Sequence, residues 1–350
     1  MTDLSIETLA SPDGGEIFRL YEEVFGASLA EGSRRRWRWQ YLENPATAPE
    51  GPEIWVAREE GRLLGQYASM PVRLWWGERE VRSSWGMDVF VAAEARGKGV
   101  GARLFTAWSD HVDVALGLGL TPSSYGLFKK LGYDDVGPVP FFRKVIDPKA
   151  VARRRLGPIG SLAAPLFGSA LRLWRPERTH PDAGLVSVVR VDGFSPAYDE
   201  LWERGRAGYA MCARRDRAYL QWKYAACPHR RYDLWEAQRN GVLCGYAVSR
   251  HEEYRGLQLG WVIDVFAEAG DAGARDALLG ALLDDFRRAG VARAQAFAMS
   301  DALAQSLRLR GFFPGPSPMQ FCVRPRQGGT EPLHDRGRWH VVFGDSDMDR

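Results

Sequence analysis

The 350-residue chain repeats itself, and this duplication constrains its fold more than any other feature of the sequence. Segments with the same residue pattern occur in the same order in both halves. The matching pairs are residues 37–45 with 220–228, 56–68 with 236–248, 88–90 with 264–266, and 131–133 with 310–312. Because 350 residues suffice for two domains of ordinary size, we expect two copies of one fold, each with its own core.

Each copy has the pattern of a mixed α/β domain. Runs of alternating or β-branched residues predict strands, and apolar residues at three- and four-residue spacing predict helices. In the first copy we expect strands at residues 4–9, 53–57, 65–69, 72–76, 88–91 and 113–121, with helices after Asp13, from Gly101 and from Ser123. Residues 37–41 place Trp37, Trp39 and Tyr41 on one face of a strand, although a short helix also fits them.

Residues 88–108 form the stretch with the clearest chemical meaning. An apolar strand ending at Val91 is followed by a glycine-rich turn and then by an amphipathic helix. Gly97, Gly99 and Gly101 let the backbone bend tightly and leave its N–H groups uncovered by side chains. The following helix directs its N-terminal partial positive charge at the same spot. This arrangement predicts a binding site for an anion, most naturally a phosphate or pyrophosphate.

The turn spells Arg-x-x-Gly-x-Gly from Arg96 to Gly101, which is neither the dinucleotide-binding pattern nor the P-loop pattern. It is similar to the acyl-CoA pyrophosphate loop of the GCN5-related N-acetyltransferases (GNAT), and residues 131–133 resemble the closing motif of that family. The resemblance implies an α/β (mixed α+β) protein made of two tandem GNAT folds, each a mostly antiparallel mixed sheet flanked by helices. We place the domains, in order, at residues 1–145 for a CoA-binding GNAT domain, 146–182 for a basic linker with helical segments, and 183–350 for a degenerate GNAT-like domain.

The resemblance also implies roles for residues of the first copy. The implied cofactor-binding residues are Val91, Arg96, Gly97, Lys98, Gly99, Val100 and Gly101, and the Val91 N–H would polarise the thioester carbonyl. Asp88 is either a general base or a structural carboxylate. Phe128 stands where the family usually has a tyrosine as general acid, and phenylalanine has no proton to give. Tyr125, one helical turn earlier, is the candidate acid, with a structural role as the alternative.

The second copy differs where the chemistry would take place. After residues 264–266 it lacks the Arg-x-x-Gly-x-Gly pattern and carries Asp271 and Asp276 around the turn instead. A carboxylate there would repel a pyrophosphate by about 1 kcal/mol even when solvated. We therefore expect that the second copy no longer binds CoA and serves as a wall of the acceptor site, as a stabilising partner, or as both.

As a whole, the resemblance implies an acyl-CoA-dependent N-acyltransferase, with acetyl-CoA as the cosubstrate and the amine of a small molecule as the acceptor. One alternative is a non-catalytic acyl-CoA-binding or regulatory protein, which the absence of a tyrosine at Phe128 favours. Another is a Fem-like aminoacyl transferase, against which the intact loop from Arg96 to Gly101 counts. We expect no metal, because the histidines show no ligand spacing.

Composition and charge exclude several other classes of protein. The net charge of +3 is too small to indicate a nucleic-acid partner. The four cysteines form no Cys-x-x-Cys pair and are too few for a disulfide framework. We find no signal-peptide pattern and no apolar run long enough for a membrane span, so we expect a cytoplasmic protein without an integral membrane segment.

Two segments leave alternatives open. Residues 143–180 hold nine Lys or Arg against two acids, and they fit either a linker packed on the domains or, at 150–178, a basic element resting on an anionic membrane surface. The C-terminal residues 339–350 carry Asp345, Asp347 and Asp349. They fit a solvated end, or a segment that folds back across the cleft and supplies carboxylates for a cationic amine.

Overall fold

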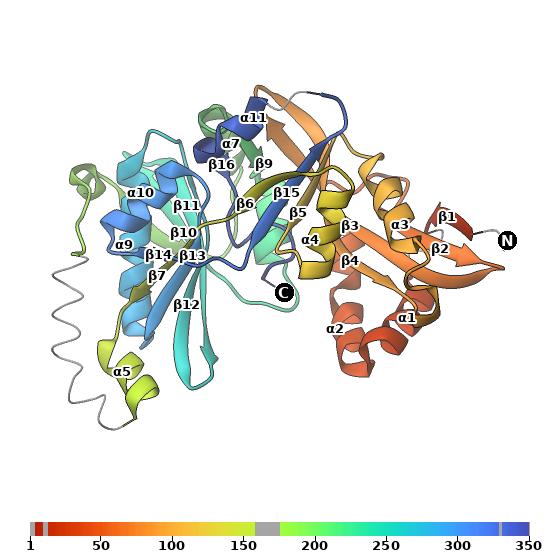
Figure 1. Cartoon of the computed structure of the whole chain (residues 1–350). Helices are drawn as coiled ribbons and strands as arrows, with labels where there is room; N and C mark the ends of the chain where they lie inside the picture. The colour runs from red at the N-terminus through yellow and green to blue at the C-terminus, as the bar shows by residue number, and fades with distance from the viewer. Residues whose placement is uncertain (1–3, 10–12, 158–175, 329–330, 350) are drawn as a thin grey trace.

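Two mixed β-sheets lie side by side in this computed structural model, each flanked by helices, and the C-terminal end of the chain lies between them (Figure 1). The structure describes residues 4–9, 13–157, 176–328 and 331–349. The mixed α/β class and the two mostly antiparallel sheets predicted from the sequence are confirmed.

The first sheet has the strand order β1-β2-β3-β4-β5-β15-β6. These strands are β1 (Leu4–Thr8), β2 (Ile54–Glu59), β3 (Arg62–Trp76), β4 (Arg79–Val91), β5 (Val114–Leu118), β15 (Gln320–Pro325) and β6 (Asp134–Pro138). Two short strands, β9 (Met211–Ala213) and β16 (Trp339–His340), extend it beside β3. All pairs along the main order are antiparallel except β4 with β5, which are parallel.

The second sheet has the order β14-β7-β13-β12-β11-β10-β8. These strands are β14 (Phe313–Gly315), β7 (Phe141–Val145), β13 (Arg293–Phe297), β12 (Leu257–Ala267), β11 (Val242–Tyr254), β10 (Asp233–Arg239) and β8 (Ser187–Val191). Read from the opposite edge, this order matches the first sheet strand for strand, including one parallel pair, β12 with β13. The duplication in the sequence is therefore a duplication of topology.

One strand of each copy lies in the sheet of the other. β15 follows the second copy in the chain but lies between β5 and β6 of the first sheet, whereas β7 follows the first copy and lies between β13 and β14 (Figure 1). The domain boundaries predicted at residues 145 and 182 stay predictions. The main strand order of each sheet contains one strand, β15 or β7, that comes from the other side of these boundaries in the chain. Neither sheet is complete without the other half of the chain.

Helices cover both sheets. The α-helices are α1 (Gly15–Phe25), α2 (Ala27–Trp37), α3 (Val100–Ser109), α4 (Pro122–Lys130), α5 (Pro148–Leu156), α7 (Ala197–Gly205), α8 (Arg217–Leu220), α9 (Ala272–Arg288), α10 (Asp301–Leu309) and α11 (Glu331–His334). The 3₁₀-helices are η2 (Ala93–Ala95), η3 (Pro181–Leu185), η4 (Arg206–Gly208) and η6 (Arg336–Arg338), and the π-helices are η1 (Arg38–Leu42) and η5 (Gln221–Ala225). The π-helices η1 and η5 are the two copies of one repeated segment, residues 37–45 and 220–228.

Two expectations about local structure need correction. Residues 65–69 and 72–76 are not separate strands but parts of the single strand β3, which continues through Pro71. Residues 37–41 are helical rather than extended, since α2 runs directly into η1. In both cases the tertiary neighbours override the local pattern, because β4 pairs along the whole of β3 and the buried aromatic face of η1 packs into the core.

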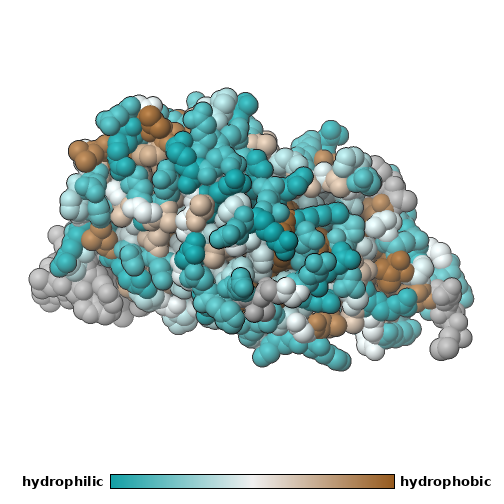
Figure 2. Space-filling view, turned by 90° about the horizontal axis from the view of Figure 1, so that it is seen from above, coloured by the Kyte–Doolittle hydropathy of each residue, from teal (hydrophilic) through white to brown (hydrophobic). Residues whose placement is uncertain are grey.

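The segment expected to be a linker starts with α5, and its predicted membrane contact at 150–178 falls largely outside the described residues. Within the described part of the chain, every helix is too short or too polar to cross a lipid bilayer. The surface in Figure 2 is mainly hydrophilic, with small scattered hydrophobic patches. A cytoplasmic location stays a prediction.

Candidate active site

The first sheet opens into a slot between its two parallel strands. The β4–β5 ladder ends at Trp85 and Leu116, although β4 continues to Val91. Beyond that point the strands no longer pair, so one side of β4 is free of its neighbour. The second sheet has the same feature, because the β12–β13 ladder ends at Val262 while β12 continues to Ala267.

The predicted anion site lies at the end of β4. Gly99 caps α3 in the left-handed region at φ 78°, and Gly97 has φ 77°, conformations that glycine adopts without strain. A Cβ added at Gly97, Gly99 or Gly101 would meet no atom within 4 Å, so the loop is open. Arg103 N–H makes the first intrahelical bond, to Gly99 O at 3.2 Å, which leaves the preceding amides of the first turn for an anion.

The implied cofactor-binding residues are brought together by this loop. Arg96 and Lys98 are exposed beside the glycines, and Arg96 Nε donates to Val91 O at 3.3 Å. Ala92 N–H donates to Leu64 O of β3 at 2.8 Å. Because successive amides of a strand point to opposite sides, the Val91 N–H points into the slot. The role that the resemblance implies for Val91 stays a prediction.

Asp88 occupies a bulge in β4 at the slot. Its φ of 44° is left-handed, a conformation that Asp tolerates better than most residues. The ladder with β3 shifts register here, so that β4 carries one extra residue. Asp88 Oδ2 accepts hydrogen bonds from Tyr41 Oη at 2.7 Å and from Gln40 Nε2 at 3.2 Å. The π-helix η1 therefore orients the half-buried carboxylate.

The sequence did not point to Gln40 and Tyr41 as part of this site. The available signal was the repeat itself, since Tyr41 recurs as Tyr224 just as Asp88 recurs as Asp264. The matching pair makes the same contact, with Tyr224 Oη donating to Asp264 Oδ2 at 3.0 Å.

Phe128 is a core residue. It is 1% exposed on α4, and its ring packs against Phe105, Tyr133 and the backbone of Gly117 on β5. Tyr125, the candidate acid, is half-exposed and donates its hydroxyl to Asp135 on β6. This hydrogen bond is the main cause that raises the pKa of Tyr125 to about 12. The hydroxyl therefore stays protonated at neutral pH.

In the second copy, the site that corresponds to the anion loop is covered. Asp271 caps α9, accepts from Ala274 N at 2.9 Å and pairs with both terminal nitrogens of Arg239 at 2.9 Å. A Cβ on Gly273, in the first turn of α9, would lie 2.9 Å from Asp182 of η3. A carboxylate and a packed segment thus fill the space that is open in the first copy.

The slot of the second copy is also filled, by the C-terminal segment 341–344. Gly344 N–H donates to Ile263 O of β12 at 2.9 Å. On the other side, Val342 forms an antiparallel bridge with Ala298, the residue that follows β13. The segment therefore lies between the two strands where they separate, and this slot has no space for a cofactor.

The carboxylate of Asp264 is sealed inside a buried polar cluster. Asp264 is 1% exposed, and besides Tyr224 its side chain contacts Arg215 Nε at 3.1 Å, Tyr246 Oη at 3.0 Å and His340 Nε2 at 3.1 Å. Burial alone would raise the pKa of Asp264, but Arg215 and the hydrogen bonds from His340 and Tyr246 lower it well below its usual range. Asp264 is a permanently charged structural group, in contrast to the half-buried Asp88.

Asp345 and Asp349 do not form a solvated end, whereas Asp347 between them is half-buried. Asp345 is fully buried, and both of its carboxylate oxygens accept hydrogen bonds from Arg215 Nη2, at 2.9 and 3.0 Å. Asp349 accepts from Arg250 Nε at 2.8 and 2.9 Å. The segment has folded back between the two halves, where protein guanidinium groups bind these two carboxylates.

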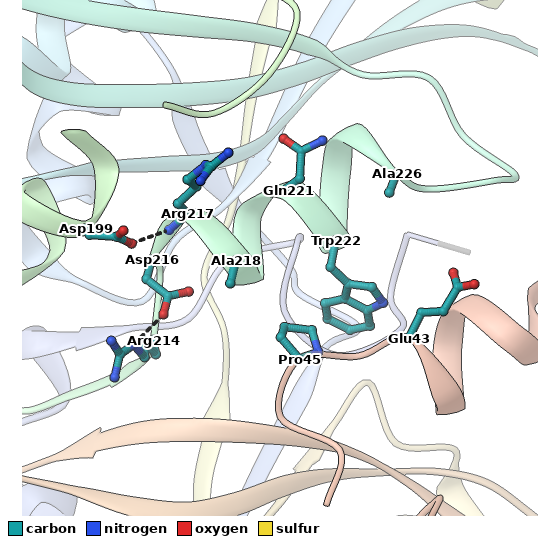
Figure 3. A pocket seen from close by; sticks show the side chains of 10 residues that line it. All are labelled: Glu43, Pro45, Asp199, Arg214, Asp216, Arg217, Ala218, Gln221, Trp222 and Ala226. Atoms are coloured by element: carbon teal, nitrogen blue, oxygen red, sulfur yellow. Dashed lines mark hydrogen bonds and ion pairs between the residues drawn. The ribbon is translucent and has the colours of Figure 1, made fainter. Parts of the chain in front are cut away.

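A surface pocket of about 490 Å³ also lies at the junction of the halves (Figure 3). Glu43 and Pro45 line it from the first half, and Trp222 is among the residues of the second half that face them. Arg214 and Asp216 at its rim pair with each other at 2.6 Å. The pocket contains none of the predicted site residues.

No cluster of His, Cys, Asp or Glu that could hold a metal ion occurs among the described residues. The exposed amides of the loop can bind an anion, and the unpaired edge of β4 can bind an extended group beside it. This arrangement is compatible with the acyl-CoA-dependent acyltransferase that the resemblance implies.

Comparison with known families places the chain more narrowly. The family model described as "Acetyltransferase (GNAT) domain" matches residues 5–136. Residues 5–136 thus match a GNAT acetyltransferase domain, the family that the motif of residues 96–101 resembles. Comparison with curated proteins gave no match.

Solved structures share the fold over nearly the whole chain. A GCN5-related N-acetyltransferase from Anabaena variabilis has a TM-score of 0.62 at 15% identity, covering 93% of this chain and 73% of its own. Eis1 from Mycobacterium abscessus has a TM-score of 0.56 at 17% identity, with 93% and 74% covered. N-myristoyltransferase from Saccharomyces cerevisiae, solved with myristoyl-CoA, has a TM-score of 0.56 at 12% identity, with 94% and 84% covered.

Proposed function

We propose that the protein is an acyl-CoA-dependent N-acyltransferase that uses the first copy as its catalytic half and acetylates the amine of a small molecule. The observation that carries this proposal is the contrast between the two copies. In the first copy, β4 and β5 separate beside an open glycine loop, whereas Asp271 and residues 341–344 fill the same places in the second copy. Because one copy of the site is open and the other is filled, we infer that only the first copy binds the cosubstrate.

In the proposed complex, the CoA pyrophosphate binds the amides between Gly97 and Gly101, with Arg96 and Lys98 beside it. The pantetheine lies in the slot along β4. The Val91 N–H points into the slot and donates a hydrogen bond to the thioester carbonyl oxygen, which becomes negatively charged as the amine attacks.

The amine nitrogen forms a bond to the carbonyl carbon, and the carbon–sulfur bond then breaks. Asp88, held by Tyr41 and Gln40, accepts the proton that the attacking amine loses. The CoA thiolate leaves and takes a proton from water or from Tyr125, whose raised pKa keeps its hydroxyl protonated. A direct transfer from the thioester to the amine, without a covalent enzyme intermediate, is the simplest route.

A non-catalytic acyl-CoA-binding protein is the second candidate. Phe128 favours it, because the buried ring provides no proton at the position where family members have their general acid. Both candidates require CoA binding, so they differ only in turnover. Release of free thiol from acetyl-CoA, measured against a panel of amines, separates them, and binding without turnover on any amine supports the second.

The binding site itself is tested by Gly99→Asp, which places a side chain and a negative charge at the N-terminus of α3. We expect at least a hundredfold loss of CoA affinity by titration calorimetry. Gly256→Asp is the matched control. Gly256 lies in the second half, has φ 75° and, like Gly99, has space for a side chain. Near-normal affinity of Gly99→Asp would overturn the assignment, and an equal loss in the control would show a general effect of the substitution.

A further inference from the structure

The C-terminal segment does not end in the slot of the second copy. It continues toward the first copy, where Met348 packs against Gly119, the residue that follows β5. We propose that Met348 is the wall that limits the length of the acyl group, so that the protein accepts acetyl and rejects longer acyl-CoA thioesters. This inference rests on the proposed function.

The position of Met348 follows from the duplication. Gly119 directly follows β5, and Ala298 directly follows β13, so the two residues correspond. In the second copy Ala298 bridges to Val342, which fills that slot. In the first copy any side chain at residue 119 would collide with Met348 Sδ. Met348 therefore stands at the mouth of the first slot, on the β5 side, as Val342 does in the second.

The segment around Met348 is fixed rather than loose. Asp345 is bound by Arg215 Nη2 at 2.9 and 3.0 Å, and Asp349 by Arg250 Nε at 2.8 and 2.9 Å. Between them, the buried Lys223 donates to Ser346 O. Three cations of the second copy thus hold the backbone on both sides of Met348. A side chain anchored in this way can act as a wall.

The chemistry of the side chain suits a limit on chain length. Met348 is partly buried and packs against the large hydrophobic core, so its thioether forms part of an apolar surface beside Gly119. A methyl group fits against such a surface, whereas each further methylene must displace the thioether. Because Gly119 has no side chain, Met348 can occupy the space beside it. A shorter side chain at residue 348 would open this space to the acyl chain.

The test compares acetyl-, butyryl- and hexanoyl-CoA by titration calorimetry, which needs no acceptor. The wild type should bind acetyl-CoA at least as tightly as the longer thioesters. Met348→Ala should reverse this order, because each methylene that enters the vacated apolar space gains up to about fourfold in affinity. We expect hexanoyl-CoA to gain on the order of tenfold to a hundredfold relative to acetyl-CoA. Met348→Leu, with a similar volume, should keep the wild-type order.

Met299→Ala is the matched control, because Met299 is a buried methionine beside the filled slot of the second copy. It should leave the order of the three thioesters unchanged, and circular dichroism checks that each variant is folded. An unchanged order in Met348→Ala, or an equal shift in Met299→Ala, would overturn the inference while leaving CoA binding intact. Failure of the wild type to bind any of the three would overturn the proposed function as well.

Discussion

Trp39 and Trp222 hold each other by a reciprocal pair of hydrogen bonds. Trp39 Nε1 donates to Trp222 O at 2.8 Å, and Trp222 Nε1 donates to Trp39 O at 2.7 Å. Their rings stack with centroids 5.2 Å apart and planes 22° apart. The two residues occupy equivalent positions in η1 and η5, so an approximate two-fold axis passes between them. The halves thus meet as the subunits of a symmetric dimer do.

We expect the tryptophan pair to couple the two halves energetically. Trp39→Ala or Trp222→Ala should lower the free energy of unfolding by about 3 to 5 kcal/mol, since each removes a large buried ring. The double variant should cost less than the sum, because both singles break the same stacked pair. Urea unfolding of the four proteins measures this coupling. Additive losses would mean that the two rings stabilise their own halves independently.

The exchanged strands predict that neither half folds alone. A fragment of residues 1–157 lacks β15, which belongs between β5 and β6, and a fragment of residues 176–350 lacks β7. Each fragment should be insoluble when expressed separately, because an unpaired edge and a gap in the core remain exposed. Coexpressed fragments should copurify as a complex. Soluble, cooperatively unfolding single fragments would contradict the exchange.

Substitution by Asn should have different effects at Asp88 and at Asp264. It should mainly lower activity at Asp88 and mainly lower stability at Asp264. Asp264→Asn removes one of the two carboxylate charges paired with the fully buried Arg215 and should lower the free energy of unfolding by about 3 kcal/mol. Asp88→Asn keeps a residue that tolerates φ 44° and should change stability by less than about 1 kcal/mol. It should reduce turnover at least a hundredfold if Asp88 is the base. Thermal unfolding and thiol release measure the two effects, and full activity of Asp88→Asn would leave Asp88 with a structural role.

The half-buried His229 and the fully buried His340 predict that acid destabilises the fold. Burial, followed by nearby Arg36, lowers the pKa of His229 to about 4, and burial also lowers the pKa of His340. Below an unfolded pKa of about 6.5 the unfolded chain binds protons that the native protein does not. The free energy of unfolding should therefore decrease as the pH falls from 6.5 toward 4.

Urea unfolding at pH 7.5 and pH 5 checks this prediction. His229→Asn should remove part of the decrease, on the order of 1 kcal/mol after solvent screening. His251→Asn, at an exposed histidine of β11, is the control and should leave the decrease unchanged. An identical decrease in all three proteins would assign the acid sensitivity to other groups.

The sequence by itself determined the duplication, the mixed α/β class and the open glycine loop. These features are encoded locally, because glycines at 97, 99 and 101 and the spacing of apolar residues act over one or two turns of chain. The loss of the loop in the second copy was equally visible, since Asp271 stands at the cap of the equivalent helix. Gln40 and Tyr41 could have been found only by asking why the repeat preserves a tyrosine together with an aspartate.

Only the tertiary structure decided which strand completes which sheet and where the C-terminus goes. The exchange of β7 and β15 leaves the strand sequences and their order in the chain unchanged, so no local pattern distinguishes it from two separate domains. The burial of Asp345 depends on its ion pair with Arg215, which lies 130 residues away in the chain. Contacts over such separations are selected by packing and by charge pairing in the folded molecule, and these place Met348 against Gly119.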